Sequence, residues 1–229
     1  MGFEILLLDL DDTILDFHWA ERRALTGALE QLGIPATEDT LSRYSRINLG
    51  CWKLLEQGKL TREELMDHRF ALLFQELGLT SGHTAAAALY PQLLAQGHRF
   101  LPGAEEALKR LSKKYRLFLV SNGNAGVQTG RLDSSGIRPY FEDIFISQEI
   151  GVDKPAAEFF ERCFARILNF DKTKTMIVGD SLTSDIQGGN NAGIATCWVN
   201  PRHLPPLDDL RIDCEIETLA QLEALLGTI

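Results

Sequence analysis

The chain has 229 residues, enough for one large domain or for a core with an inserted subdomain. A hydrophobic content of 45% can fill a core, and a net charge of −9 argues against nucleic acid or an anionic membrane as the main partner. The four cysteines are scattered without a C-x-x-C pair, so we expect buried free thiols in a reducing compartment rather than disulfides or a zinc site.

The first predicted element is a short buried strand, Glu4–Leu8, which runs directly into the acidic segment Asp9-Leu10-Asp11-Asp12-Thr13. Because no charged segment precedes this apolar run and acids end it, we expect neither a signal peptide nor a membrane span. The sequence therefore predicts a soluble, cytoplasmic protein.

Helical spacing fills the next part of the chain, and we find no convincing strand in it. The predicted helices are Trp19–Leu32, Asp39–Glu56, Arg62–Leu77 and Thr84–Gln96. Thr61 and Glu64 have the spacing of a capping box at the start of one of them. We therefore predict an all-α cap subdomain over residues 17–98, inserted into an α/β core of residues 1–16 and 99–229.

Strands and helices alternate in the second half of the chain. The predicted strands are Leu117–Ser121, Ile144–Ser147, Thr175–Gly179 and Ala195–Val199. The predicted helices are Val127–Ser135, Glu158–Leu168, Ser184–Ala192 and Leu219–Leu226. This alternation is typical of a parallel sheet with helices on both faces. The predicted fold class is α/β, a Rossmann-like parallel-sheet core with the all-α subdomain inserted after the first strand.

Polar residues follow the predicted strands at the points where those strands end. Asp9 and Asp11 follow the first strand, Ser121 and Asn122 close the second, and Asp180 follows the fourth. The carboxyl ends of parallel strands meet at one edge of a sheet, which is where ligands bind in open α/β folds. A cluster of buried like charges needs a cation, a shared proton or a reaction to justify it.

The predicted set suits phosphoryl transfer. Asp9 can attack phosphorus and form an acyl phosphate, and Asp11 can protonate the leaving oxygen and later deprotonate water. Ser121 and the adjacent N–H groups, including that of Asn122, can bind the phosphate oxygens. Lys154, which leads into a later helix, can neutralise charge on the phosphate and on Asp9.

The same residues predict a magnesium site, because Mg²⁺ prefers oxygen ligands in octahedral geometry. We assign Asp9, Asp11 and Asp180 as metal-binding positions, with one ligand expected to be a backbone carbonyl. Asp185 is predicted to support the metal from further out. The Thr13 hydroxyl is expected to hold the loop through bonds to the backbone.

Taken in order, these motifs resemble those of the haloacid dehalogenase-like superfamily of phosphohydrolases. The matching segments are Asp9-Leu10-Asp11-Asp12-Thr13, Ser121-Asn122-Gly123, Lys154-Pro155 and Gly179-Asp180-Ser181-x-x-x-Asp185. The resemblance covers the whole chain, and the helical insertion looks like the α-helical cap of that superfamily. It implies a Mg²⁺-dependent phosphoric monoester hydrolase that works through an aspartyl phosphate.

Further segments resemble the pyrimidine 5′-nucleotidase group within that superfamily. They begin at Arg131-Leu132, at Ile146-Ser147 and at Asp185-Ile186. Similarity to this group implies removal of the 5′-phosphate from UMP, dUMP, dTMP and related nucleotides. The expected partner is then a small phosphorylated metabolite, a nucleotide, with no nucleic acid polymer and no membrane, and the expected state is a monomer or weak homodimer. Asn48 and Trp52 share one helix face and are the predicted substrate contacts.

Other activities use a similar core, because cap residues set the choice of substrate. A phosphatase for a small sugar phosphate or phosphoglycolate, or a phosphoglucomutase-like enzyme, is the alternative. A haloalkanoic acid dehalogenase needs no second carboxylate, so Asp11 favours phosphoryl chemistry. A signalling receiver domain lacks a large helical insertion after its first strand, and a scaffold that only binds phospho-ligands would not need Asp9, Asp11, Lys154 and Asp180 together.

Overall fold

The computed structural model describes residues 2–227, which fall into two compact units. One unit consists of the described residues up to Phe17 together with those from His98 on and is called the sheet unit here; the other, His18–Gly97, is called the helical unit. The two chain segments that connect the units lie side by side within the sheet unit, where Leu15 and Phe100 form an antiparallel bridge. The Asp16 N–H donates to the Arg99 carbonyl beside it at 2.8 Å.

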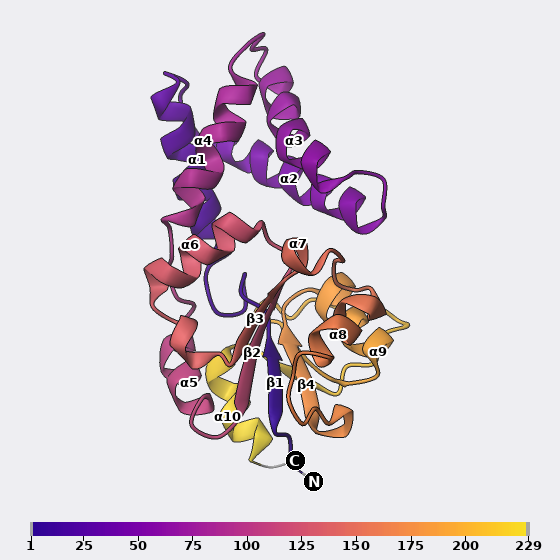
Figure 1. The fold of residues 1–229 in the computed structure, drawn as a ribbon. Coiled ribbons are helices and arrows are strands. Elements are labelled where there is room, and N and C mark those ends of the chain that lie inside the picture. Colours follow the sequence, from indigo (N-terminus) through magenta and orange to yellow (C-terminus); the bar gives the residue numbers. More distant parts are fainter. Residues whose placement is uncertain (1, 228–229) are drawn as a thin grey trace. The chain divides into compact units, whose positions relative to one another are not determined.

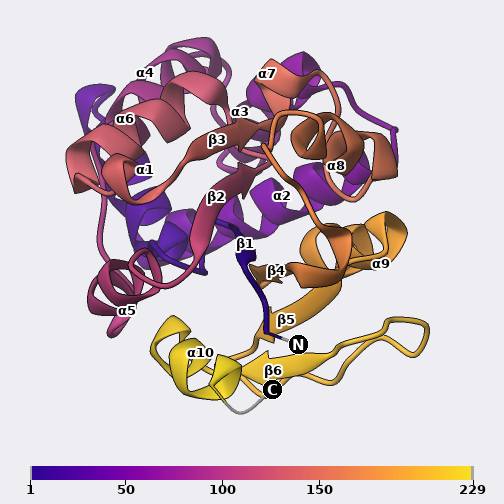
Figure 2. The same cartoon turned by 60° about the horizontal axis from the view of Figure 1, so that its bottom comes forward.

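The sheet unit is built on six parallel strands in the order β3-β2-β1-β4-β5-β6 (Figures 1 and 2). The strands are β1 Ile5–Leu8, β2 Arg116–Ser121, β3 Asp143–Ile146, β4 Thr175–Gly179, β5 Ala195–Val199 and β6 Cys214–Ile216. The predicted α/β fold with a Rossmann-like parallel sheet is confirmed. Since β1 lies between β2 and β4, the residues that follow these three strands share one edge of the sheet.

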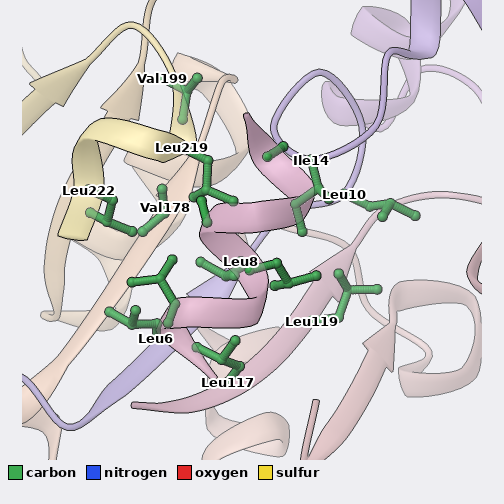
Figure 3. Close-up of a cluster of buried hydrophobic side chains, with 14 of the residues drawn as sticks. Leu6, Leu8, Leu10, Ile14, Leu117, Leu119, Val178, Val199, Leu219 and Leu222 are labelled. Carbon is green, nitrogen blue, oxygen red and sulfur yellow. The ribbon is translucent and has the colours of Figure 1, made fainter. Parts of the chain in front are cut away.

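Both faces of the sheet are buried, which explains why β1 is a continuous apolar run rather than an alternating one. Leu6 and Leu8 face one core cluster, and Ile5 and Leu7 face the other. Figure 3 shows the first cluster, in which Leu6 and Leu8 lie among side chains from neighbouring strands and from the helix that carries Leu219 and Leu222. The core thus fixes β1 from both sides and determines where its carboxyl end lies.

The helices of the sheet unit divide between these two faces. They are α5 Ala104–Leu111, α6 Ala125–Ser135, α7 Ser147–Ile150, α8 Ala157–Phe164, α9 Gln187–Ala192 and α10 Leu219–Leu226. Buried residues of α5, α6 and α10 join the cluster of Leu6 and Leu8, whereas those of α8 and α9 join the cluster of Ile5 and Leu7. Short 3-10 turns occur at Arg138–Tyr140 and Lys172–Lys174, and a π-helical turn at Leu182–Ile186.

The helical unit contains α1 Phe17–Gln31, whose first residue belongs to the sheet unit, and then α2 Glu38–Glu56, α3 Arg62–Glu76 and α4 His83–Ala95. Its aromatic core is formed by Tyr44, Phe70 and Tyr90, whose ring centroids lie 5.0 to 5.4 Å apart. The predicted capping box is present, because the Glu64 N–H donates to the Thr61 hydroxyl at 3.2 Å and the Glu64 carboxylate accepts from the Thr61 N–H at 2.8 Å.

Several elements differ from the sequence prediction. The predicted helix Glu158–Leu168 ends at Phe164, because the chain then tightens into i→i−3 bonds such as that from the Arg166 N–H to the Cys163 carbonyl. The predicted helix Ser184–Ala192 begins as the π-helical turn. Neither α5 nor β6 was predicted; β6 is a three-residue edge strand of mixed polarity and has almost no periodicity to detect.

The four cysteines are free thiols, as predicted; Cys51, Cys163 and Cys197 are buried, whereas Cys214 is only half-buried. None of the helices in the described part of the chain has both the length and the apolar character needed to cross a membrane.

Candidate active site

The carboxyl edge of the sheet brings together residues that are far apart in the sequence. Asp9 directly follows β1, Ser121 is the last residue of β2, and Asp180 directly follows β4. Lys154 lies in the loop between α7 and α8 and is 1% exposed. Asp185 lies in the π-helical turn after β4 and is equally buried. The packing of the sheet therefore assembles the predicted residues at one place.

The Lys154 ammonium is the centre of this site. Its Nζ lies 2.7 Å from Asp9 Oδ1, 2.6 Å from Asp185 Oδ1 and 3.0 Å from the Val120 carbonyl oxygen. Each of its three N–H groups thus has one acceptor. A buried lysine would be unstable without such partners, so this arrangement accounts for its burial.

Three carboxylates surround one possible cation position. One oxygen each from Asp9, Asp180 and Asp185 lies within 4.8 Å of the other two. Among the described residues, Lys154 is the cation that pairs with this cluster, through Asp9 and Asp185. Three carboxylates then share one ammonium, so the cluster has a net negative charge when all four groups are ionised. Hard carboxylate oxygens at this spacing fit Mg²⁺. The structure groups Asp185 with Asp9 and Asp180 by its side chain, while the Asp11 side chain lies in a different set of contacts.

Asp185 is held close to the strand end by the local backbone. Its Oδ2 accepts from the Ser181 N–H at 3.1 Å. A Cβ at Gly179 would lie 2.2 Å from that same oxygen, so only glycine leaves room for the carboxylate here. The Trp198 indole N–H donates to the Asp180 carbonyl at 2.9 Å and fixes the adjacent backbone.

Burial and like charge together shift the acids of this site. Burial, opposed by the Lys154 charge and reinforced by Asp185 and Asp11, raises the pKa of Asp9 to about 8. Burial and the neighbouring Asp9 and Asp185 raise the pKa of Asp180 well above its ordinary value. Burial opposes the ionised form of Lys154, but Asp185 and Asp9 outweigh it and raise the pKa of the lysine. The lysine therefore stays charged, whereas the carboxylates need a second cation to ionise together.

This electrostatic arrangement predicts how stability depends on pH without metal. Between about pH 5 and 8 the folded protein holds protons on Asp9 and Asp180 that the unfolded chain has released, since an unfolded Asp has a pKa near 3.8. The free energy of unfolding should therefore fall as pH rises through this window. Urea denaturation in EDTA at pH 5, 6, 7 and 8 measures it, and added Mg²⁺ should stabilise the protein more at pH 8 than at pH 5.

Asp9→Asn is the matched control for this titration, because it removes one of the groups and keeps its size. The variant should show a shallower decline than the wild type. A stability in EDTA that rises from pH 5 to pH 8 would contradict the assignment of bound protons to this cluster.

Asp11 points to a different group of side chains. Its Oδ1 forms an ion pair with Arg131 Nη1, and its Oδ2 accepts from Gln128 Nε2 at 2.7 Å. The same Gln128 nitrogen donates to Ser121 Oγ at 2.8 Å, so the Asp11 and Ser121 side chains are linked through one amide. Neither Gln128 nor Arg131 was predicted as a site residue. Both are polar residues on the inward stripe of α6, beside Val127 and Leu132.

Asn122 fixes the loop that carries Lys154. Its amide donates to the Lys154 carbonyl at 2.8 Å and accepts from the Lys154 N–H at 2.9 Å. The side chain of Asn122 is thus engaged with backbone, and any contact of this residue with phosphate would come from its main-chain N–H.

The turn after Asp9 is shaped mainly by backbone bonds. The Ile14 and Leu15 N–H groups both donate to the Leu10 carbonyl, at 3.0 and 2.9 Å. Asp12 has a φ of 55°, and its carboxylate accepts from the Phe17 N–H at 2.9 Å. The predicted hydroxyl–backbone bond of Thr13 was wrong, since Thr13 Oγ1 is buried without a hydrogen-bond partner among the described residues. The backbone bonds already close the turn.

The two predicted substrate contacts, Asn48 and Trp52, lie on α2 in the helical unit. Asn48 is buried; its amide donates to Glu21 Oε1 at 2.7 Å and accepts from Arg69 Nη1 at 2.9 Å. Trp52 is half-buried, and the Arg62 guanidinium lies 5.6 Å from the centroid of its ring. These contacts place Asn48 in a structural network within the helical unit, and its contact with substrate stays a prediction.

The chain is similar in sequence to several known proteins. YfnB of Bacillus subtilis, described as a HAD-hydrolase, is 40% identical over 225 residues, which cover 98% of this chain and 96% of YfnB. The pyrimidine 5′-nucleotidase PynA of Streptococcus pneumoniae is 43% identical over 205 residues, 89% of this chain and 86% of PynA. The pyrimidine 5′-nucleotidase YjjG of Escherichia coli is 29% identical over 229 residues, 99% of each chain.

One solved structure is similar to this fold over nearly the whole chain. A crystal structure of YfnB bound to magnesium matches with a TM-score of 0.95, over 99% of this chain and 100% of YfnB, at 40% identity. Interdomain movement is described for that YfnB structure. A family model for haloacid dehalogenase-like hydrolases matches residues 3–193, the span that contains every residue of the carboxylate cluster and Lys154. The chain is therefore an enzyme that belongs to the haloacid dehalogenase-like hydrolases.

Proposed function

We propose that this hydrolase is a Mg²⁺-dependent phosphatase that removes the 5′-phosphate from pyrimidine nucleoside 5′-monophosphates such as UMP, dUMP and dTMP. The observation that carries the chemistry is the contact of Asp9 with Lys154 inside the cluster that Asp9 forms with Asp180 and Asp185. The substrate class is supported by the similarity to PynA and YjjG over most or all of the chain.

The reaction divides into two steps on the chain's own residues. The Asp9 carboxylate oxygen attacks phosphorus, the bond from phosphorus to the 5′ oxygen breaks, and Asp11 gives that oxygen a proton. Water then attacks the phosphorus of the aspartyl phosphate, Asp11 takes its proton, and inorganic phosphate leaves with Asp9 restored. Lys154 and the Ser121 hydroxyl stabilise the charge on the phosphoryl oxygens throughout.

Asp9, Asp180 and Asp185 are the side chains that would hold Mg²⁺, with the Asp11 backbone carbonyl as a further proposed ligand. The bound ion supplies positive charge to the phosphate and to the crowded carboxylates. Because the pKa of Asp9 is raised to about 8 in the metal-free site, this charge also favours the ionised form that Asp9 needs as a nucleophile.

The helical unit is the proposed cap that selects the substrate. Within it, the half-buried Trp52 ring offers a face for a nucleobase, and Asn48 would act through the helix that it shares with Trp52. A cytoplasmic location, a monomeric or weakly dimeric state and the absence of nucleic acid or membrane partners also stay predictions.

A panel of phosphorylated metabolites tests the proposal. With Mg²⁺ present, UMP, dUMP and dTMP should give higher kcat/KM values than phosphoglycolate and hexose phosphates. EDTA should abolish phosphate release, and added Mg²⁺ should restore it. Asp9→Asn, prepared in the same way, is the blank for contaminating phosphatases. A preference for the sugar phosphates or phosphoglycolate would favour the alternative substrate class, and hydrolysis that persists in EDTA would contradict the metal assignment.

A further inference from the structure

Two polar side chains of α6, those of Gln128 and Arg131, are buried inside the sheet unit. Gln128 is 1% exposed and Arg131 is 0% exposed, although their neighbours on the same helix stripe, Val127 and Leu132, are apolar. Burying an amide and a guanidinium is costly unless each finds specific partners. Their side chains contact Asp11, Ser121 and each other, so the cost of burying them is tied to the site.

The Gln128 amide has only one orientation that satisfies its surroundings. Its Nε2 uses both hydrogens, one toward Asp11 Oδ2 at 2.7 Å and one toward Ser121 Oγ at 2.8 Å. Its Oε1 accepts from Arg131 Nη1 at 3.3 Å. A flipped amide would place its oxygen against the Asp11 carboxylate and its NH₂ group against the guanidinium, which loses the bonds to Asp11 and Arg131.

This orientation determines what the Ser121 hydroxyl can do. Ser121 Oγ accepts from Gln128 Nε2 and also from the Gly123 N–H at 3.1 Å. A hydroxyl has two acceptor lone pairs and one hydrogen. Because both lone pairs are occupied, Ser121 can contribute only as a donor, which is what an anionic phosphoryl oxygen requires.

Arg131 completes the hold on Asp11. Its Nη1 pairs with Asp11 Oδ1, so the two oxygens of that carboxylate are each bound by a residue of α6. The guanidinium itself is backed by the Phe17 ring, whose centroid lies 5.8 Å from the Arg131 Cζ atom. The direction of the Asp11 side chain is thus set by a buried, packed helix rather than by the loop that carries it.

We infer that Gln128 and Arg131 are positioning residues for phosphate ester hydrolysis: Gln128 makes Ser121 a donor to the phosphate, and Gln128 and Arg131 together hold Asp11, the proposed proton donor to the leaving oxygen, in a fixed position. The inference rests on the proposed phosphatase function and adds two residues that would act through Asp11 and Ser121. If the inference is correct, loss of either residue should lower kcat/KM most for substrates with a poor leaving group, because their leaving oxygen needs a proton from Asp11.

The test compares kcat/KM for UMP with kcat/KM for p-nitrophenyl phosphate, because p-nitrophenolate leaves without needing a proton. A positioned general acid contributes about 10²–10⁴-fold, so Arg131→Met should lower kcat/KM for UMP about 100-fold and for p-nitrophenyl phosphate less than about 5-fold. Arg131→Lys keeps the cation and should recover part of the UMP activity. Retained turnover of p-nitrophenyl phosphate in the same preparation shows that the variant is folded.

Gln128→Met should lower kcat/KM for UMP and, by about 10-fold, for p-nitrophenyl phosphate, since it removes the hydrogen bonds to both Asp11 and Ser121. The loss with p-nitrophenyl phosphate should vanish in a Ser121→Ala background, where no hydroxyl is left to orient. Gln128→Glu keeps the size but sets a second carboxylate against Asp11, and it should be no more active than Gln128→Met.

Arg138→Met and Gln92→Met are the matched controls, because both remove exposed side chains and should leave both substrates unaffected. Equal losses for the two substrates in Arg131→Met, unchanged activity, or a gain with UMP would each overturn the inference. A wild type that hydrolyses neither substrate would instead refute the proposed function, so the two failures are distinct.

Discussion

Asp9→Asn is expected to lower turnover of UMP by about 10⁴-fold or more while leaving the fold intact. The side chain keeps its shape, but an amide cannot form the acyl phosphate, so no route through the aspartyl phosphate is left. The fold should persist because β1 is held by Leu6 and Leu8 on one face and by Ile5 and Leu7 on the other, and Asp9 contributes no packing to either cluster. Steady-state phosphate release and the circular dichroism spectrum measure the two halves of this prediction.

A chemical trap sharpens the result. Wild-type enzyme quenched during turnover should carry a hydroxylamine-sensitive phosphoryl group, and Asp9→Asn should carry none. Asp133→Asn is the matched control, since that carboxylate is exposed and pairs with Arg138 on the surface. Near-wild-type turnover by Asp9→Asn, or an undiminished trapped phosphoryl group, would refute Asp9 as the nucleophile.

Lys154→Met is expected to affect stability and activity together. The substitution leaves Asp9 and Asp185 buried without the ammonium that now lies 2.7 and 2.6 Å from them. Removing one partner of a buried ion pair costs about 3–5 kcal/mol of unfolding free energy. Turnover should also fall about 10³-fold, because the phosphate and Asp9 lose a directed positive charge.

The pH dependence separates this effect from a simple packing defect. At pH 5 a protonated Asp9 needs no cation, so the destabilisation in EDTA should be smaller there than at pH 8. Added Mg²⁺ should recover part of the lost stability at pH 8. Lys109→Met, which removes an exposed lysine paired with Glu105 one helical turn away, should change neither property measurably. A loss that is equal at both pH values would show that Lys154 acts only through packing.

The elements that the sequence predicted best are those bounded by clear changes in composition. The predicted strands Thr175–Gly179 and Ala195–Val199 have the bounds of β4 and β5, and the predicted helix Leu219–Leu226 has the bounds of α10. In each case an apolar stretch ends at a glycine or a polar residue, which marks the boundary locally. The edge strand β6 carries no such signal, because its pairing with β5 and not its composition makes it a strand.

Most of the candidate site follows from local sequence for the same reason. Asp9 and Asp180 directly follow apolar strands and Ser121 closes one, and parallel strands place such residues at a common edge. The grouping of Asp185 with the metal-binding carboxylates depends on the π-helical turn and on the room that Gly179 leaves, which spacing alone does not reveal.

The chain by itself determined the α/β class, the site at the strand ends and the residue types needed for phosphoryl transfer, because strand periodicity and motif spacing are local properties. Only the tertiary structure decided how those groups are held. Lys154 reaches Asp9 across 145 residues, and Gln128 and Arg131 reach Asp11 across 117 and 120 residues. Such contacts depend on how α6 and the Lys154 loop pack against the sheet. The local sequence around a glutamine or an arginine on one face of a helix does not predict which distant residue its side chain contacts.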